Sequence, residues 1–231
     1  MRRFYYLYWI AGKTLSAVKQ ISFTIIGSIK TNKPITDIEK DLNSKLKEDN
    51  IASAVLKNLS GDIYSESWAK PLLLTIEYQN READFSSFIE LGKYLQAEHI
   101  LPQKYKENHD WSHIENRVAE RFLHSAGNLT ILSDKRNLEA KHYSFADKIS
   151  IYSGYGKKKD KDNGFTSFRI SQLIVDDYNS NKYNKLWSLD SMIDRNNWFM
   201  AEVQRIIDID TSSLKLSKDT IFASAIEAKT S

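Results

Sequence analysis

The sequence contains no cysteine, and it has only three prolines and eight glycines among its 231 residues. The absence of cysteine excludes disulfide bonds, thiol nucleophiles and zinc sites built from cysteine, and it fits a protein of the reducing cytoplasm. So little glycine and proline excludes collagen-like repeats and a mainly disordered chain. No apolar run approaches the roughly 20 residues that a membrane-spanning helix needs. We therefore expect a globular protein without a membrane segment.

The chain also lacks a large excess of either charge. It has 33 Lys or Arg against 30 Asp or Glu, a net charge of +3, which is too small to predict nucleic-acid binding by itself. Hydrophobic residues make up 41% and charged residues 27%, the composition of a folded protein with one large or two small domains. Residues 99–161 hold twelve basic against eight acidic residues, so the basic excess is concentrated in this segment.

The N-terminal segment has a superficial likeness to a secretory signal, because two arginines precede an aromatic and aliphatic run. Tyr5, Tyr6 and Tyr8 interrupt that run, and Lys13 follows early, which is unlike a signal peptide. Apolar residues at helical spacing instead predict an amphipathic helix that continues to about Lys30. We therefore expect the protein to stay in the cytoplasm.

Residues 1–80 are predicted to be entirely helical, and they show no site-like constellation of residues. A capping box of Thr36 and Glu39 predicts the start of a second helical stretch, which ends at Gly61. Residues 72–78 are apolar enough for a buried third helix.

The remainder divides by composition into a longer mixed region and a short polar end. Residues 81–210 are predicted to form the functional domain, and residues 211–231 a polar tail. Within the domain, an apolar stripe predicts a helix from Asp110 to Gly127, and another helix begins near Ser188.

Three short strings stand out, although each alone is a weak signal. Glu98 and His99 end a β-prone run, and Asn128 opens a second one. Asn137 follows nine residues later, in the first turn of a predicted helix. A β-hairpin and a helix can bring such side chains to one metal ion. The strings are EHILPQ at 98–103, GNLTIL at 127–132 and KRN at 135–137.

This combination resembles the HNH, or ββα-metal, endonucleases, and it is closest to the C-terminal domain of GmrSD-like type IV restriction enzymes. The resemblance covers roughly residues 70–210, and both the second and the third position of the HNH pattern are Asn here. It implies a mainly α fold with a small ββα-metal (HNH, His-Me finger) active-site motif inserted in a helical frame. Further matching residues are Trp111, Phe145 with Lys148, and Trp187 with Ile193 and Arg195.

Phosphodiester hydrolysis requires a proton acceptor for water and a cation that takes up negative charge. His99 is the predicted general base, because a neutral imidazole accepts a proton near neutral pH. Glu98 and Asn137 offer the hard oxygen ligands that suit Mg²⁺ or Mn²⁺. By family correspondence, Asn128 belongs to the catalytic group as a support, because it braces the loop that carries His99 and fixes the ring orientation.

Six basic residues are predicted to contact DNA, although a solvated surface is the alternative for each of them. Arg117 and Arg121 continue a stripe that starts at His109 and His113 with i, i+4 spacing. Zinc binding by His142, or by the pair His109 and His113, is disfavoured because no third ligand converges with them. The six residues are Arg117, Arg121, Lys135, Arg136, Lys141 and Lys148.

The sequence thus predicts a metal-dependent DNA endonuclease module that restricts foreign or modified DNA. One alternative is an inactive nucleic-acid-binding or protein-interaction module that retains the HNH shape, and another is a purely structural helical protein. The resemblance also implies an NTP-using sensor domain that precedes the nuclease. The sequence has no phosphate-binding string of the G-x-x-x-x-G-K-[ST] type. The sensor is therefore expected in a partner chain or in a missing N-terminal part, of which residues 1–80 would be the tail or linker.

Overall fold

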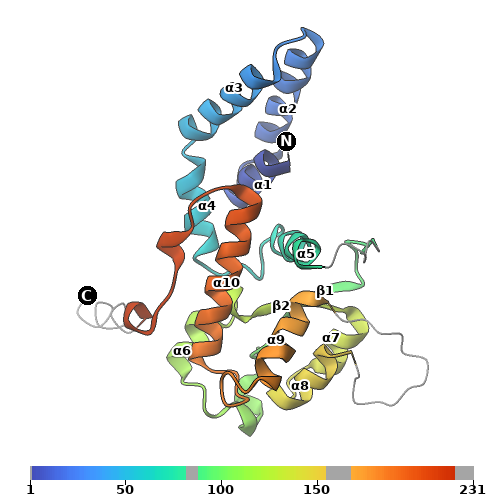
Figure 1. Cartoon of the computed structure of the whole chain (residues 1–231), viewed down its shortest axis with the longest axis vertical. Helices are drawn as coiled ribbons and strands as arrows, with labels where there is room; N and C mark the ends of the chain where they lie inside the picture. Colours follow the sequence, from blue (N-terminus) through green and yellow to red (C-terminus); the bar gives the residue numbers. More distant parts are fainter. Residues whose placement is uncertain (1, 82–87, 155–167, 222–231) are drawn as a thin grey trace.

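The computed structural model describes residues 2–81, 88–154 and 168–221. Helices dominate this part of the chain, and the strands pair in a single antiparallel sheet (Figure 1), so the prediction of a mainly α protein is confirmed. The elements are α1 (Arg2–Ile10), α2 (Leu15–Lys30), α3 (Ile35–Glu48), α4 (Ile51–Leu59), α5 (Ala69–Asn80), β1 (Leu95–His99), η1 (Tyr105–Glu107), η2 (His109–Trp111), α6 (Asn116–Phe122), η3 (Ala126–Asn128), β2 (Leu129–Ser133), α7 (Asp134–Ala140), α8 (Phe145–Tyr152), α9 (Arg169–Asn179), α10 (Leu189–Ile207) and η4 (Ser212–Leu214).

The N-terminal region is helical as predicted, but its first helix is divided. Gly12 has φ of +71°, a conformation that glycine adopts easily and that ends α1. The Thr14 side chain then accepts a hydrogen bond from the amide of Ala17 and caps α2. The prediction of one helix to Lys30 was wrong because helical spacing of apolar residues persists across the break. Helices α2 and α3 lie at one end of the molecule, far from the sheet (Figure 1).

The two strands place the predicted motif residues next to one another. Strand β1 pairs antiparallel with β2, so that Glu98 lies opposite Thr130 and His99 lies opposite Leu129. Helix α7 follows β2 directly and contacts both strands. The chain order β1, β2, α7 therefore matches the order of elements predicted from the three strings.

The sheet lies between two hydrophobic clusters. Leu129 and Ile131 of β2 belong to the cluster that also holds α1, α4 and α5, whereas Leu132 belongs to the cluster around α6 and α8. Successive side chains of a strand point to opposite faces, which explains this division. Helix α10 contributes to both clusters. Met192 belongs to the cluster around α6 and α8, and Phe199 belongs to the cluster that holds α1, α4 and α5.

Packing continues across residue 80, where the sequence analysis places a boundary. Glu77 of α5 is fully buried, and its carboxylate accepts hydrogen bonds from the backbone amides of Arg169 and Ile170. A carboxylate at this position satisfies the unpaired amides that begin α9 and is stabilised by the helix dipole. Arg81 also donates to Glu77 at 2.8 Å. Glu77 therefore ties the N-terminal helices to the segment that follows the sheet.

The segment predicted as one helix from Asp110 to Gly127 is instead divided into η2, α6 and η3. Gly127 sits where a Cβ would come within 2.5 Å of the Met192 carbonyl oxygen and 3.1 Å of the Asn196 Cβ. This glycine is therefore required by close packing against α10. Helix α10 begins after Ser188, as predicted, and Ser188 forms a capping box with Ser191.

In the part of the chain that the structure describes, no helix combines the length and the apolar character needed to span a bilayer.

Candidate functional site

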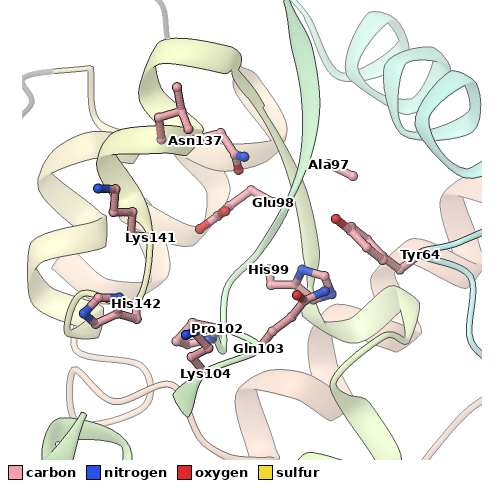
Figure 2. A pocket seen from close by; sticks show the side chains of 11 residues that line it. Tyr64, Ala97, Glu98, His99, Pro102, Gln103, Lys104, Asn137, Lys141 and His142 are labelled. Atoms are coloured by element: carbon pink, nitrogen blue, oxygen red, sulfur yellow. The ribbon is translucent and has the colours of Figure 1, made fainter. Parts of the chain in front are cut away.

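A pocket of about 410 Å³ lies between the C-terminal end of β1 and helix α7. It brings together Glu98, His99 and Asn137, the three residues for which the sequence predicted one shared site. Figure 2 shows Glu98 on the side of β1 that faces Asn137, and His99 on the side that faces Tyr64. The remaining lining residues are Ala97, Pro102, Gln103, Lys104, Leu138, Lys141 and His142.

Glu98 is almost fully buried and is held by two residues of α8. Lys148 Nζ donates to Glu98 Oε1 at 2.6 Å, and the Tyr152 hydroxyl donates to the same oxygen at 3.3 Å. Burial raises the pKa of Glu98, while Lys148 and Tyr152 oppose that rise. Because both bonds fall on Oε1, the second carboxylate oxygen takes no part in them. The pocket is thus lined by a carboxylate that hydrogen bonds from α8 hold in position.

Lys148 connects Glu98 to the backbone of its neighbour. Its Nζ donates to the His99 carbonyl oxygen at 2.6 Å, in addition to the bond with Glu98. The Lys148 side chain is only 1% exposed, and burial lowers its pKa while Glu98 opposes that change. A buried ammonium between two oxygen acceptors restricts the conformation of the strand end that carries both motif residues.

His99 ends β1, and its ring contacts two residues that the motif analysis did not select. His99 Nε2 lies 3.0 Å from His124 Nδ1, and the Tyr64 ring packs at 4.1 Å between centroids. Burial lowers the pKa of His99 to about 3, and the electrostatic influence of the neighbouring His124 and Lys148 acts in the same direction. The imidazole is therefore neutral near neutral pH and has a nitrogen lone pair that can accept a proton.

Asn137 lies in helix α7, and its side-chain oxygen could act as a ligand in the pocket. Asn137 Oδ1 is buried and has no hydrogen-bond partner among the residues that the structure describes. Buried polar oxygens are nearly always satisfied, so an unpaired one in a pocket indicates a ligand, a water molecule or a cation. Glu98 and Asn137 together offer carboxylate and amide oxygens, the donors that Mg²⁺ and Mn²⁺ prefer. Among the described residues, no group of three or more His, Asp or Glu gathers as a metal site.

Asn128 is fully buried and makes four hydrogen bonds away from the pocket. Its Oδ1 accepts from the Leu101 amide at 2.7 Å and from Trp187 Nε1 at 3.1 Å. Its Nδ2 donates to the carbonyl oxygens of Leu101 and Leu123 at 3.0 and 2.9 Å. These bonds hold the backbone that follows His99. Asn128 does not contact the imidazole ring of His99, whose hydrogen-bond partner is His124.

The predicted DNA-contact residues fall into three groups. Lys141 is exposed, lines the pocket and has a positive φ of 35°, which turns the chain at the end of α7. Lys135 is exposed on the same helix. The prediction of direct DNA contact is corrected for Lys148 and Arg136, because both are buried: Lys148 binds Glu98, and Arg136 donates to the Gly154 carbonyl at 2.9 Å.

The third group, Arg117 and Arg121, lies on α6, which Figure 1 places apart from α7. Arg117 pairs with Glu115 at 2.7 Å. The predicted stripe from His109 does not form, because residues between η2 and α6 are not helical. His113 contacts the carbonyl oxygens of Asp110 and Trp187 at 3.1 and 3.0 Å. His113, Arg117 and Arg121 do not line the pocket.

Sequence reasoning missed Tyr64, His124 and Lys104. Tyr64 comes from the N-terminal region, where the sequence shows no site-like constellation, and it nevertheless lines the pocket. His124 stands four positions before Asn128, just upstream of a recognised string, and that proximity was the one available signal. Lys104 immediately follows the EHILPQ string and lines the pocket.

Comparison with known protein families matches residues 32–202 to the C-terminal domain of GmrSD restriction endonucleases. No curated protein and no solved structure matches the chain. The family match covers the greater part of the chain, including every residue that lines the pocket. The chain therefore belongs to the family of GmrSD restriction endonuclease C-terminal domains, which are nuclease domains of restriction enzymes.

Proposed function

We propose that this chain is an HNH-type DNA endonuclease that uses a divalent cation, Mg²⁺ or Mn²⁺, to restrict foreign or modified DNA. One observation carries the proposal: Asn137, whose buried Oδ1 has no hydrogen-bond partner in the described part of the chain, lines the same pocket as Glu98 and His99. An oxygen left unpaired in a pocket is costly unless a ligand satisfies it. The family match supports DNA as the substrate.

Glu98 and Asn137 would hold the cation, Glu98 through its carboxylate and Asn137 through its amide oxygen. Bound there, a divalent cation supplies stabilisation of the negative charge that develops on the phosphate and the leaving oxygen. Lys148 keeps the Glu98 carboxylate in place through its 2.6 Å hydrogen bond, so the carboxylate does not have to be ordered when a ligand arrives.

His99 would accept a proton from the attacking water. Its low pKa keeps it neutral, and a phosphate placed beside it would raise that pKa, because a negative charge favours the imidazolium form. Lys141 and Lys104, both exposed and both lining the pocket, would hold the phosphate of the bound strand. Asn128 would support the backbone after His99 through its bonds to Leu101.

The test is nicking of supercoiled plasmid DNA as a function of Mn²⁺ concentration, with the complete protein if the chain is part of a longer one. His99→Ala should lose activity by ~10² to 10⁴, and raised Mn²⁺ should not restore it, because a base is missing. Glu98→Ala and Asn137→Ala should be partly restored, since mass action compensates for a weakened ligand set. Asn128→Ala should lose ~10- to 100-fold.

His109→Ala is the matched control, because His109 is exposed and does not line the pocket. It should cut like the parent protein. Melting temperatures of all variants show whether a loss of activity reflects unfolding. A folded His99→Ala protein that cuts as fast as the parent would overturn the assignment of the base, and nicking unaffected by excess EDTA would overturn the metal dependence.

A second candidate function is DNA binding without cleavage. The observation that favours it is the bond between Lys148 and Glu98, because an ammonium already neutralises the carboxylate. This candidate predicts DNA binding that survives in the His99→Ala variant and no cutting by the parent with any metal. A requirement for an NTP-using sensor, in a preceding domain or a partner chain, is tested by repeating the nicking assay with that component added.

A further inference from the structure

The ring of His99 has a specific partner in His124. His99 Nε2 and His124 Nδ1 lie 3.0 Å apart, and the rings meet edge to face with an interplanar angle of 77°. A distance of 3.0 Å between two ring nitrogens is that of a hydrogen bond, so one nitrogen carries the proton and the other accepts it. The direction of this bond determines which nitrogen of His99 remains available to the pocket.

The two directions have opposite chemical consequences. If His99 donates from Nε2, its Nδ1 has a free lone pair and the ring can take a proton from water. If His124 donates instead, the proton of the neutral His99 sits on Nδ1, and neither nitrogen is free to act as a base. Only the first direction also survives proton transfer, because the imidazolium form of His99 still donates from Nε2, and a charged donor makes that bond stronger.

We propose that His124 is a positioning residue that accepts a hydrogen bond from His99 Nε2 and thereby fixes the tautomer in which Nδ1 is the proton acceptor; this rests on the proposed function of His99 as the base. In proteins, the hydrogen bond made by one ring nitrogen of a histidine generally determines whether the other nitrogen carries a proton.

Neighbouring residues restrict the orientation of the His99 and His124 rings. The His124 carbonyl oxygen accepts a hydrogen bond from the Ile63 amide at 3.0 Å. This bond fixes the neighbouring Tyr64, whose ring packs against His99 at 4.1 Å and against His124 at 5.6 Å. Tyr64 therefore limits rotation of both imidazoles. Lys148 binds the backbone carbonyl oxygen of His99, whereas the hydrogen-bond partner of the His99 ring is His124.

His124 is half-buried, whereas His99 is only 6% exposed. In the proposed direction, His124 Nδ1 is the acceptor, and the ring proton of His124 sits on Nε2. A half-exposed ring can place such an N–H in water at little cost, whereas the buried ring of His99 depends on a protein partner. Burial thus favours His99 as the donor and His124 as the acceptor.

The test compares His124→Phe, which keeps an aromatic ring but removes the acceptor, with His124→Asn, whose amide oxygen can replace Nδ1 as an acceptor. His124→Phe should lower kcat by ~10- to 100-fold, with little change in KM, because the substrate is not touched. His124→Asn should recover a large part of that loss. His109→Phe, outside the pocket, is the control for replacing a histidine by phenylalanine and should leave kcat unchanged.

Nitrogen NMR of protein labelled in histidine reads the tautomer independently of cutting, and His99→Gln assigns the signal. The parent should show His99 protonated at Nε2, and His124→Phe should show a mixture of tautomers. A parent protein with His99 protonated at Nδ1, or a folded His124→Phe variant with unchanged kcat and a single tautomer, would overturn the inference. If the parent fails to cut but its tautomer depends on His124 as described, the positioning stands and the proposed function falls.

Discussion

Removal of the Lys148 ammonium should destabilise the fold strongly, because two buried oxygen acceptors depend on it. Lys148→Met keeps most of the side-chain volume but leaves the Glu98 carboxylate and the His99 carbonyl without the donor that lies 2.6 Å from each. The side chains of Lys148 and Glu98 are only 1% and 7% exposed, so water cannot replace the lost bonds. Breaking a buried ion pair from one side typically costs ~3 to 5 kcal/mol, and we expect Lys148→Met to fall in that range.

A double-mutant cycle separates the charge from the packing. In a Glu98→Gln background the carboxylate is gone, so Lys148→Met should cost less than in the parent, by about 2 kcal/mol. The remaining cost comes from the unpaired His99 carbonyl, a buried acceptor worth ~1 to 3 kcal/mol. Lys135→Met, on the exposed face of α7, is the matched control and should stay within about 0.5 kcal/mol of the parent.

The assay is urea unfolding near neutral pH with EDTA present, which keeps metal binding out of the comparison. Without Lys148, the pKa of Glu98 should rise further, because the hydrogen bond and the positive charge that lower it are removed. Neutralisation of Glu98 in the folded state then stabilises the variant in acid, so the deficit of Lys148→Met should shrink as the pH falls toward about 5. A cost below about 1 kcal/mol, or an equal cost in both backgrounds, would refute the reasoning.

Two further predictions concern Gly127 and His99. Gly127→Ala should destabilise the protein by ~1 to 3 kcal/mol in urea, because the new Cβ would meet the Met192 carbonyl oxygen at 2.5 Å; a neutral result would show that α10 moves freely. His99 has a folded pKa of about 3, below its ordinary 6.5, so the unfolded state binds more protons between these values and stability falls as the pH decreases. Between about pH 7.5 and about pH 5 this contribution should be about 2 kcal/mol, and His99→Gln should show a correspondingly weaker pH dependence in the presence of EDTA.

The local elements of the site were predictable from sequence because each has a short-range cause. The β-prone runs that end at His99 and begin after Asn128 pair as β1 and β2, and the helix with Asn137 follows directly. The start of α10 after Ser188 was also predictable, because the apolar residues of this helix recur at helical spacing. The order of the three strings also predicted that Glu98, His99 and Asn137 line one pocket.

Boundaries that depend on a single backbone conformation were harder to predict. The apolar spacing continues across Gly12, and only the left-handed φ of that residue separates α1 from α2. The segment from Asp110 to Gly127 likewise keeps an apolar stripe although it is divided into three short elements. The spacing of apolar residues indicates which side of a segment is buried. It does not reveal a turn after which the same side of the chain remains buried.

The partners of the site residues were decided by tertiary structure alone. By itself, the sequence determined which side chains sit at the end of β1 and on α7, since alternation and helical spacing follow from the backbone. It could not determine that Lys148 binds Glu98 from 50 positions away, or that His124 lies against the ring of His99 from 25 positions away. A basic residue reads equally well as a surface contact or as a buried partner, because the distinction depends on which helix packs against which strand. That packing also brings Tyr64 to the pocket.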